Sequence, residues 1–155
     1  SHGVNFGKLK KGKSDERENF IGNLMQQFPN LKYNILGISN ELPKWNYNFY
    51  NELAKCKMSL NLSRGKPLKY TSSNRIAALV GNGIFTFIDI NTKFNDFFDD
   101  NEVGFYKNVK DLGNKIEYLL KYPKKINEYG KRGKEKYFKL FNNKIITKKI
   151  IEKTF

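Results

Sequence analysis

The chain alternates short apolar runs with amphipathic segments, and this alternation constrains the fold more than any other feature of the sequence. Apolar residues alternate over Met58–Leu62, and an almost wholly apolar run follows at Ile84–Ile90. Between these runs, residues 72–81 have small apolar side chains at helical spacing and end at Gly81–Gly83. A helix that joins two strands in this way is the crossover of a parallel sheet. We therefore expect neighbouring parallel strands at the two apolar runs.

Further elements extend this alternation in both directions. Strands that alternate with helices four or five times predict the α/β class, as a Rossmann-like doubly wound parallel sheet. The C-terminal tail, from about residue 108 to 155, is predicted to be helical. The other expected elements are a strand near residues 4–7, a helix from Ser14 to Pro29 that buries Phe20, Ile21, Leu24, Met25 and Phe28, a strand over Tyr33–Ile38, a helix over Tyr47–Lys55, a short aromatic helix around Phe94–Phe98 and a strand over Glu102–Tyr106.

A length of 155 residues predicts one domain with a substantial core. We interpret Ser1-His2 as the remnant of a cleaved tag, so the domain covers residues 3–155 and the only histidine is set aside. The single cysteine, Cys56, excludes an internal disulfide and a cysteine-built zinc site, and it fits the cytoplasm. We expect no metal and no cofactor. The longest apolar run is shorter than a membrane-spanning helix needs.

The net charge of +14 is concentrated near the C-terminus, because residues 107–155 hold fifteen basic and five acidic residues. Such a surface can attract an anionic membrane, a nucleotide or a nucleic acid, or it can be a solvated lysine-rich helical face. The tyrosines of this region fall at the spacing of a helix core, which disfavours base stacking on nucleic acid. They are Tyr118, Tyr122, Tyr129 and Tyr137, with Phe138 beside the last. The joint abundance of Lys, Asn, Ile, Phe and Tyr is what codon bias in an AT-rich genome produces, and we expect a bacterial protein.

The segment from Ser63 to Arg75 is the best candidate site, because ligands of doubly wound sheets bind beyond the carboxyl ends of the strands. Free amides at a helix start, together with Arg75, suit a phosphate or diphosphate. In the alternative interpretation Thr71 or Ser72 only caps the helix and Arg75 pairs with a carboxylate. Four cations within twelve residues favour the anion site, namely Arg64, Lys66, Lys69 and Arg75. Two other loops meet the same edge, Gly7–Lys13 and Asp89–Lys93.

Several chemistries are excluded by missing motifs. The sequence has no Gly-x-Gly-x-x-Gly fingerprint and no phosphate-loop motif, and a Ser-His-Asp triad needs a native histidine. An acidic cluster at residues 96–102 is interpreted as solvated turn residues beside the buried aromatic rings of Phe94, Phe97 and Phe98. Within it, Glu102 precedes a strand, and we consider that it reaches the ligand crevice.

Three consecutive stretches, "CKMSLNLSRG", "SSNRIAALVGNG" and "FIDINTKFNDFFDDNEVGFY", carry a family resemblance. Their order and spacing resemble the C-terminal, donor-binding domain of GT-B glycosyltransferases, in particular that of the glycosyl transferases group 1. The resemblance extends roughly from Cys56 to Phe141. It implies a Rossmann-like half that binds a nucleotide-diphosphate sugar, and an N-terminal half of the same protein that binds the acceptor.

The resemblance also implies roles for individual residues. It places Arg75, Lys69 and the amides of Ser72, Ser73 and Asn74 on the donor diphosphate. It places Ser63, Arg64, Gly65, Gly7 and, less directly, Glu102 near the nucleotide. One departure is informative: Ala78 stands where members of the family commonly carry a helix glutamate that contacts the sugar or ribose, and alanine has no side-chain acceptor.

These observations lead to one expected function and two alternatives. We expect the nucleotide-sugar-binding domain of a cytoplasmic glycosyltransferase, inactive by itself, whose basic tail rests on an anionic membrane surface. The first alternative is a glycosyltransferase-like interaction module without catalysis, as Ala78 suggests. The second is a basic nucleic-acid-binding domain.

Overall fold

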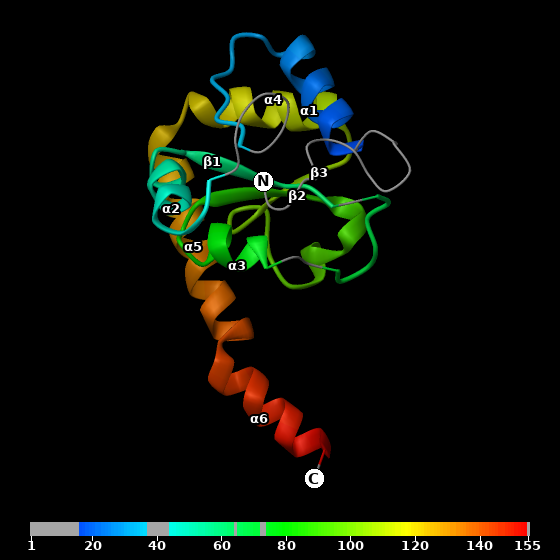
Figure 1. Ribbon diagram of the computed structural model, residues 1–155, viewed down its shortest axis with the longest axis vertical. Helices are drawn as coiled ribbons and strands as arrows, with labels where there is room; N and C mark the ends of the chain where they lie inside the picture. The colour runs from blue at the N-terminus through cyan, green and yellow to red at the C-terminus, as the bar shows by residue number, and fades with distance from the viewer. Residues whose placement is uncertain (1–15, 37–43, 64, 72–73, 155) are drawn as a thin grey trace.

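The computed structural model describes residues 16–36, 44–63, 65–71 and 74–154. Its centre is a three-stranded parallel sheet of β1 (Met58–Asn61), β2 (Phe85–Asp89) and β3 (Gly104–Tyr106), in the order β1-β2-β3 (Figure 1). The register pairs Met58 with Phe85 and Phe87 with Gly104. The expectation of parallel strands at the two apolar runs is therefore confirmed.

Helices cover both faces of the sheet, because side chains alternate between the two faces of each strand. Phe85 and Phe87 of β2 lie on the face covered by α1 (Glu16–Gln27) and α4 (Val109–Leu120). Ile88 lies on the opposite face with α3 (Arg75–Val80). Figure 1 shows α1 and α4 above the sheet and α3 below it. The fold is thus α/β and Rossmann-like, with the helical tail that the sequence predicts.

The two faces hold separate apolar cores. The α1–α4 face packs Leu24, Phe85, Phe87, Tyr106 and Leu112 into one cluster. The α3 face continues into two short 3₁₀ turns, η1 (Ile90–Thr92) and η2 (Phe94–Asp96). Its cluster consists of Ile76, Val80, Ile88, Phe94, Phe98, Val103 and Phe105. Phe94 and Phe98 are buried as predicted, although their segment forms a 3₁₀ turn and not an α-helix.

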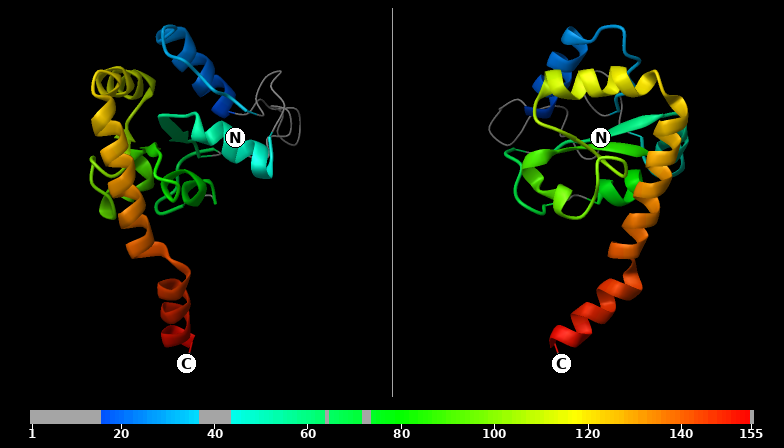
Figure 2. Two further views of the ribbon diagram at one scale, coloured as in Figure 1. Left: turned by 90° about the vertical axis from the view of Figure 1, so that its left-hand side faces the viewer. Right: turned by 180° about the vertical axis from the view of Figure 1, so that it is seen from behind.

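The long helix α5 (Pro123–Phe141) joins the two cores along the amino-terminal edge of the sheet. Ile126 near its start packs in the Phe85 cluster, whereas Tyr137 and Phe141 near its end pack against the Phe98 cluster. Figure 2 shows α5 passing from the layer of α4 towards that of α3. Two glycines permit this path: a Cβ atom on Gly130 would collide with the carbonyl oxygen of Gly83, and one on Gly133 with that of Glu102.

The described residues form two further helices. The helix α2 (Asn46–Ala54) packs Phe49 and Leu53 against Leu79 of α3. The helix α6 (Asn143–Thr154) follows the predicted break at Asn142-Asn143 and extends away from the sheet (Figures 1 and 2).

The strand predicted over Tyr33–Ile38 is wrong for residues 33–36, which form no ladder. Tyr33 is instead tied to the end of α1, where its hydroxyl donates to the carbonyls of Phe28 at 2.8 Å and Leu24 at 3.2 Å. An apolar run of this length does not by itself form a strand, because strand formation also depends on a neighbouring strand with which the run can pair. Residues 37–38, the predicted strand near residues 4–7 and the cap Ser14 lie outside the described residues.

Other predicted details also differ. The helix expected over residues 72–81 is only six residues long, and within the described ranges Asn74 precedes it without a side-chain cap. Met25, predicted to be buried in α1, is 41% exposed. Among the three described strands the order is sequential, so the reversal of strand order that marks a ligand crevice is not within this part of the chain.

The close approach of α5 to the sheet edge can be tested by adding single methyl groups. We expect Gly130→Ala to lower the free energy of unfolding by about 1–3 kcal/mol, since the new Cβ must displace backbone. Gly22→Ala in α1 is the matched control, because nothing lies within 4 Å of the added carbon, and it should stabilise the helix by up to about 1 kcal/mol. Urea denaturation measures both; equal effects would contradict the packing described for α5.

Candidate functional site

The carboxyl ends of the three strands meet at one edge of the sheet. The register pairs Asn61 with Ile88 and Asp89 with Tyr106, so Leu62, Asp89 and Tyr106 end at the same level. The Asp89 side chain accepts from the amide of Asn91 and so shapes the turn after β2. Burial first, and then the Asp89 carboxylate, raise the pKa of the Tyr106 phenol, which is therefore neutral near pH 7.

Arg75 lies at this edge as the first residue of α3. Its side chain is 9% exposed, and Nη1 donates a hydrogen bond of 3.0 Å to the carbonyl oxygen of Leu62, the residue after β1. A guanidinium keeps its charge when buried, so its field is little screened by water. The structure therefore places a permanent cation against the end of β1.

Asn61 is a second polar residue at this place, and the sequence analysis did not select it as a site residue. Its side chain is 7% exposed and its Oδ1 is buried without a hydrogen-bond partner among the described residues. Buried acceptors of this kind are uncommon and call for an explanation. The sequence signal was weak, because Asn61 occupies a polar position of the alternating run Met58–Leu62, and only the low frequency of asparagine in strands marks it.

The loop over residues 65–71 is held against the turns that follow β2. The Tyr70 amide donates to the Thr92 carbonyl at 2.8 Å, and the Tyr70 hydroxyl donates to Asp96 at 2.6 Å. Tyr70 adopts a positive φ of 59°, which costs energy that these contacts offset. Lys69 lies with its Nζ 4.6 Å from the centre of the Tyr70 ring. The exposed cation of Lys69 is thus at the same edge as Arg75, engaged with an aromatic face.

Glu102 is not brought together with these residues. It precedes β3 by two residues, so it lies at the amino-terminal edge, about 13 Å from the level of Tyr106 along the strand direction. Its carboxylate accepts from the Asp99 amide at 2.9 Å and lies 3.9 Å from Lys136 of α5. The expectation that Glu102 reaches the ligand crevice conflicts with this position. The crevice is expected at the carboxyl edge of the sheet, and Glu102 lies at the opposite, amino-terminal edge.

The remaining predicted residues fall into two groups. Ser63 lies two residues after β1 and is half-buried, Gly65 is exposed with a φ of 71°, and Asn74 is exposed before α3. Gly7, Arg64, Ser72 and Ser73 lie outside the described residues, so the predicted amide cradle stays a prediction.

A small pocket of about 150 Å³ lies between α2 and α3. Ala78 lies one helical turn after Arg75, so the pocket is next to the buried cation along α3. Trp45 and Tyr50, which are 56% and 52% exposed, supply aromatic faces. The lining residues are Lys44, Trp45, Asn46, Phe49, Tyr50 and Ala78.

Glu52 holds one wall of this pocket in place. Its carboxylate binds Lys44 at 2.7 Å and Lys55 at 3.1 Å and accepts from Asn34. Hydrogen bonds from Lys44, Lys55 and Asn34 lower the pKa of Glu52 to about 2. Because the pKa is depressed in the folded state, this anchoring is complete above the ordinary carboxyl range and is lost as the pH falls towards 2.

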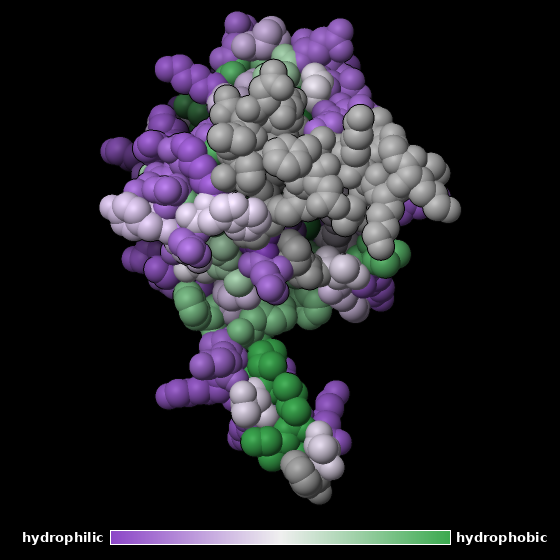
Figure 3. Space-filling view, viewed as in Figure 1, coloured by the Kyte–Doolittle hydropathy of each residue, from purple (hydrophilic) through white to green (hydrophobic). Residues whose placement is uncertain are grey.

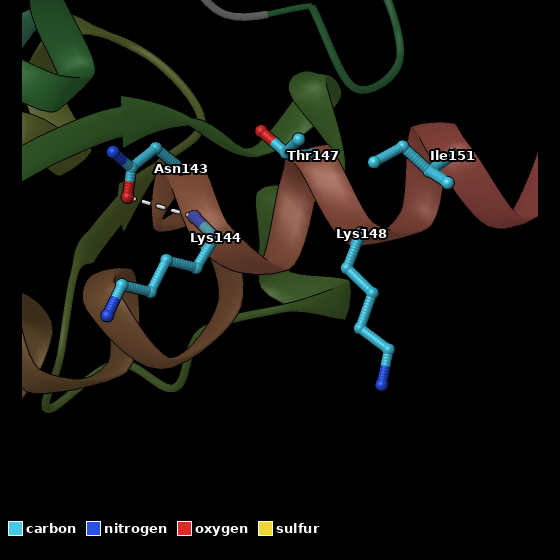
Figure 4. Close-up of a pocket in the computed structure, with 5 residues that line it drawn as sticks. All are labelled: Asn143, Lys144, Thr147, Lys148 and Ile151. Atoms are coloured by element: carbon cyan, nitrogen blue, oxygen red, sulfur yellow. Dashed lines mark hydrogen bonds between the residues drawn. The ribbon is translucent and has the colours of Figure 1, made fainter.

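Other parts of the described chain provide weaker candidates for a binding site than the carboxyl edge of the sheet. A second depression, of about 440 Å³, is lined only by residues of α6 and is therefore an open groove along one helix (Figure 4). The described residues contain no group of three or more side chains suited to a metal ion. None of the described helices is long and apolar enough to cross a membrane.

The prediction that the aromatic residues of the C-terminal region lie at core positions of their helices is confirmed only in part. Tyr129 and Tyr137 pack against the two cores. Tyr118, Tyr122 and Phe138 are instead 53%, 42% and 49% exposed. Tyr118 and Tyr122 contact each other on the surface with ring centres 5.1 Å apart, so each ring shields part of the other from water.

The unpaired acceptor of Asn61 leads to a prediction about stability. Replacing it by the similarly shaped Asn61→Leu should leave the free energy of unfolding unchanged or raise it, because no hydrogen bond to Oδ1 is lost. Thr86→Val on the same face is the comparison, since Thr86 Oγ1 lies 2.8 Å from both the Ser59 hydroxyl and the Ile84 carbonyl. It should cost about 1–2 kcal/mol in chemical denaturation. A larger loss from Asn61→Leu would show that the acceptor is satisfied in the folded protein.

Comparison with known proteins gives one clear result. A model of the family described as glycosyl transferase-like matches residues 16–152, nearly the whole chain. No curated protein and no solved structure gives a significant match. The matched region contains the three described strands and, at their carboxyl edge, the buried residues Asn61 and Arg75. The chain belongs to the glycosyl transferase-like family.

Proposed function

We propose that this domain binds the nucleotide-diphosphate sugar donor of a glycosyltransferase at the carboxyl edge of its sheet. The observation that carries the proposal is Arg75, a buried cation at the end of β1 in a member of the glycosyl transferase-like family. A donor diphosphate is a compact dianion, and a guanidinium offers it several donors in a fixed plane. Arg75 uses Nη1 on the Leu62 carbonyl, which orients the rest of the guanidinium.

The pocket beside Ala78 is the place that we assign to the nucleoside of the donor. It lies one helical turn from Arg75, and Trp45 and Tyr50 provide flat aromatic faces for a base or a sugar ring. Ala78 supplies no acceptor for the ribose hydroxyls. In this proposal they are bound by neighbouring polar groups of the pocket, Lys44 and Asn46.

Asn61 fits the same proposal as a specificity residue. Its Oδ1 accepts no hydrogen bond from the described residues, yet it lies next to the carbonyl that Arg75 binds. A hydroxyl or amino group of the donor supplies the missing hydrogen. A site built to bond such a group discriminates strongly against a ligand that lacks it.

Catalysis would require a second domain. In the proposed enzyme this domain holds the donor, and its cations stabilise the departing nucleotide diphosphate electrostatically. The acceptor and a catalytic base come from the N-terminal half of the protein. The alternative is an interaction module that keeps the fold and has lost donor binding, and the binding experiment below separates the two.

Replacing Arg75 tests the donor site directly. We expect UDP, GDP or ADP to bind the wild-type chain in calorimetry, and Arg75→Met to weaken that binding at least tenfold, because a buried charge contact to the diphosphate is lost. Arg132→Met on α5 is the matched control, since Arg132 is an exposed arginine distant from the edge. Arg75→Lys should recover only part of the affinity.

The outcomes separate the candidate functions. Binding that depends on Arg75 and weakly on salt supports the donor site. Failure of all three nucleotides to bind, or equal losses from Arg75→Met and Arg132→Met, contradicts it and favours the interaction module. Tight binding to DNA or RNA that falls steeply with salt would favour the nucleic-acid alternative.

The role of a second domain predicts that binding and turnover are separable. The 155-residue chain should bind donor nucleotide without transferring or hydrolysing the sugar, since it supplies no acceptor site. The measurement is release of nucleoside diphosphate from UDP-, GDP- and ADP-sugars, with a longer form of the protein as comparison. Sugar transfer by the 155 residues alone would overturn the requirement for a second domain.

A further inference from the structure

The loop over residues 65–71 lies at the carboxyl edge of the sheet with little of its apolar surface buried. It lies between β1 and α3 in the chain, and Figure 1 shows it beside the turns that follow β2. Leu68 is 65% exposed, and Lys66 and Lys69 are exposed as well. In Figure 3 this margin of the domain shows apolar and hydrophilic side chains together on the surface. Specific contacts must therefore hold the loop in place.

Tyr70 makes these contacts with both turns that follow β2. Its amide donates to the Thr92 carbonyl at 2.8 Å, and its hydroxyl donates to Asp96 at 2.6 Å. Thr92 is buried, and Asp96 belongs to η2, whose Phe94 packs in the core on the α3 face. The Tyr70 ring also contacts Phe97, with ring centres 5.2 Å apart. Tyr70 thus ties the loop after β1 to a well-packed part of the fold at the end of β2.

The backbone of Tyr70 shows that these contacts oppose a conformational cost. The Thr71 amide donates to the Leu68 carbonyl at 3.1 Å, so residues 68–71 form a turn with Tyr70 as its third residue. The φ of Tyr70 is 59°, and a positive φ at this position of a turn favours glycine or asparagine. Strained residues of this kind persist only where their surroundings fix them, and they are frequent at ligand sites.

Lys69 is the group that Tyr70 holds. It is the second residue of the same turn, and its Nζ lies 4.6 Å from the centre of the Tyr70 ring. Lys69 forms no ion pair with any residue that the structure describes. The aromatic ring attracts the ammonium on one side, and the hydrogen-bond donors on its other side remain available to an anion.

We propose that Tyr70 is a positioning residue of the donor site, which fixes the loop over residues 65–71 and so holds Lys69 at the same edge as Arg75. The inference rests on the proposed donor function. Arg75 acts from a buried position at the end of β1, and Lys69 acts from the exposed loop. A diphosphate has oxygens enough for both cations. Because the loop is fixed before binding, the ligand does not have to order it, and less conformational entropy is lost.

The test measures the affinity of the 155-residue chain for UDP, GDP and ADP by calorimetry. Tyr70→Gly removes the ring and the hydroxyl, while glycine adopts the native φ without strain, and we expect a loss of about tenfold or more. Tyr70→Phe keeps the ring and loses only the hydrogen bond to Asp96, so a loss of about threefold is expected. In a Lys69→Gln background, Tyr70→Gly should weaken binding by less than about twofold further, because the cation that it positions is already absent.

Three comparisons separate positioning from general damage to the fold. Asp96→Asn keeps an acceptor oxygen for the Tyr70 hydroxyl and should bind within about twofold of wild type, whereas Asp96→Ala should behave like Tyr70→Phe. Tyr118→Phe alters an exposed tyrosine near the end of α4 and should leave binding unchanged. Without ligand, hydrogen exchange of the amides over residues 65–71 should quicken in Tyr70→Gly and not in Tyr118→Phe.

The outcomes distinguish this inference from the proposed function. If nucleotide binding depends on Arg75 but Tyr70→Gly binds like wild type, the inference is wrong and the donor site stands. The same conclusion follows if Tyr70→Gly weakens binding equally with and without Lys69, because Tyr70 would then act on the fold in general. If the wild-type chain binds none of the three nucleotides, both the donor site and the inference are wrong.

Discussion

Burial of β2 on both of its faces is the constraint on which the rest of the structure depends. Phe85, Phe87 and Ile88 are each at most 2% exposed, so one short strand contributes to two separate cores. Each core needs its own cover, and α1 with α4 supplies one while α3 and the aromatic turns supply the other. The helix α5 can join both only because Gly130 and Gly133 let it approach the strand ends. The parallel arrangement follows, since α3 between β1 and β2, and the segment with η1 and η2 between β2 and β3, each return the chain to the same end of the sheet.

The same arrangement explains where polar groups can gather. Parallel strands bring all carboxyl ends to one edge, and there the apolar cores end. Arg75 and Asn61 are buried polar residues at the end of β1, and the described chain buries few other polar side chains, namely Arg17, Thr86 and Thr92. Burying a cation and an unsatisfied amide costs stability. Such a cost is typical of a binding site, where a ligand completes the interactions, as we propose for the donor diphosphate at this edge.

The chain also divides its charge between two surfaces. Arg75 lies buried at the sheet edge, whereas most of the excess lysines lie on the exposed surfaces of α5 and α6. A buried cation acts at short range on one bound group, while an exposed array acts over about a Debye length on a broad surface.

Period and spacing in the sequence were sufficient to predict the strands at residues 58 and 85, the α/β class, the helical tail and the position of Arg75 in the first turn of a helix. They did not predict the structure of residues 33–36, where the Tyr33 hydroxyl bonds to α1 and the segment stays out of the sheet. They also did not predict at which edge of the sheet Glu102 lies, because that depends on the direction of β3. Asn61 was missed because an unsatisfied acceptor is defined by its surroundings. By itself the sequence determined which segments are apolar and whether their apolar residues recur at strand or helix spacing, because this pattern depends only on neighbouring residues. Only the tertiary structure decided which polar groups share an edge and which are buried together, because distant segments must first pack to remove water from them.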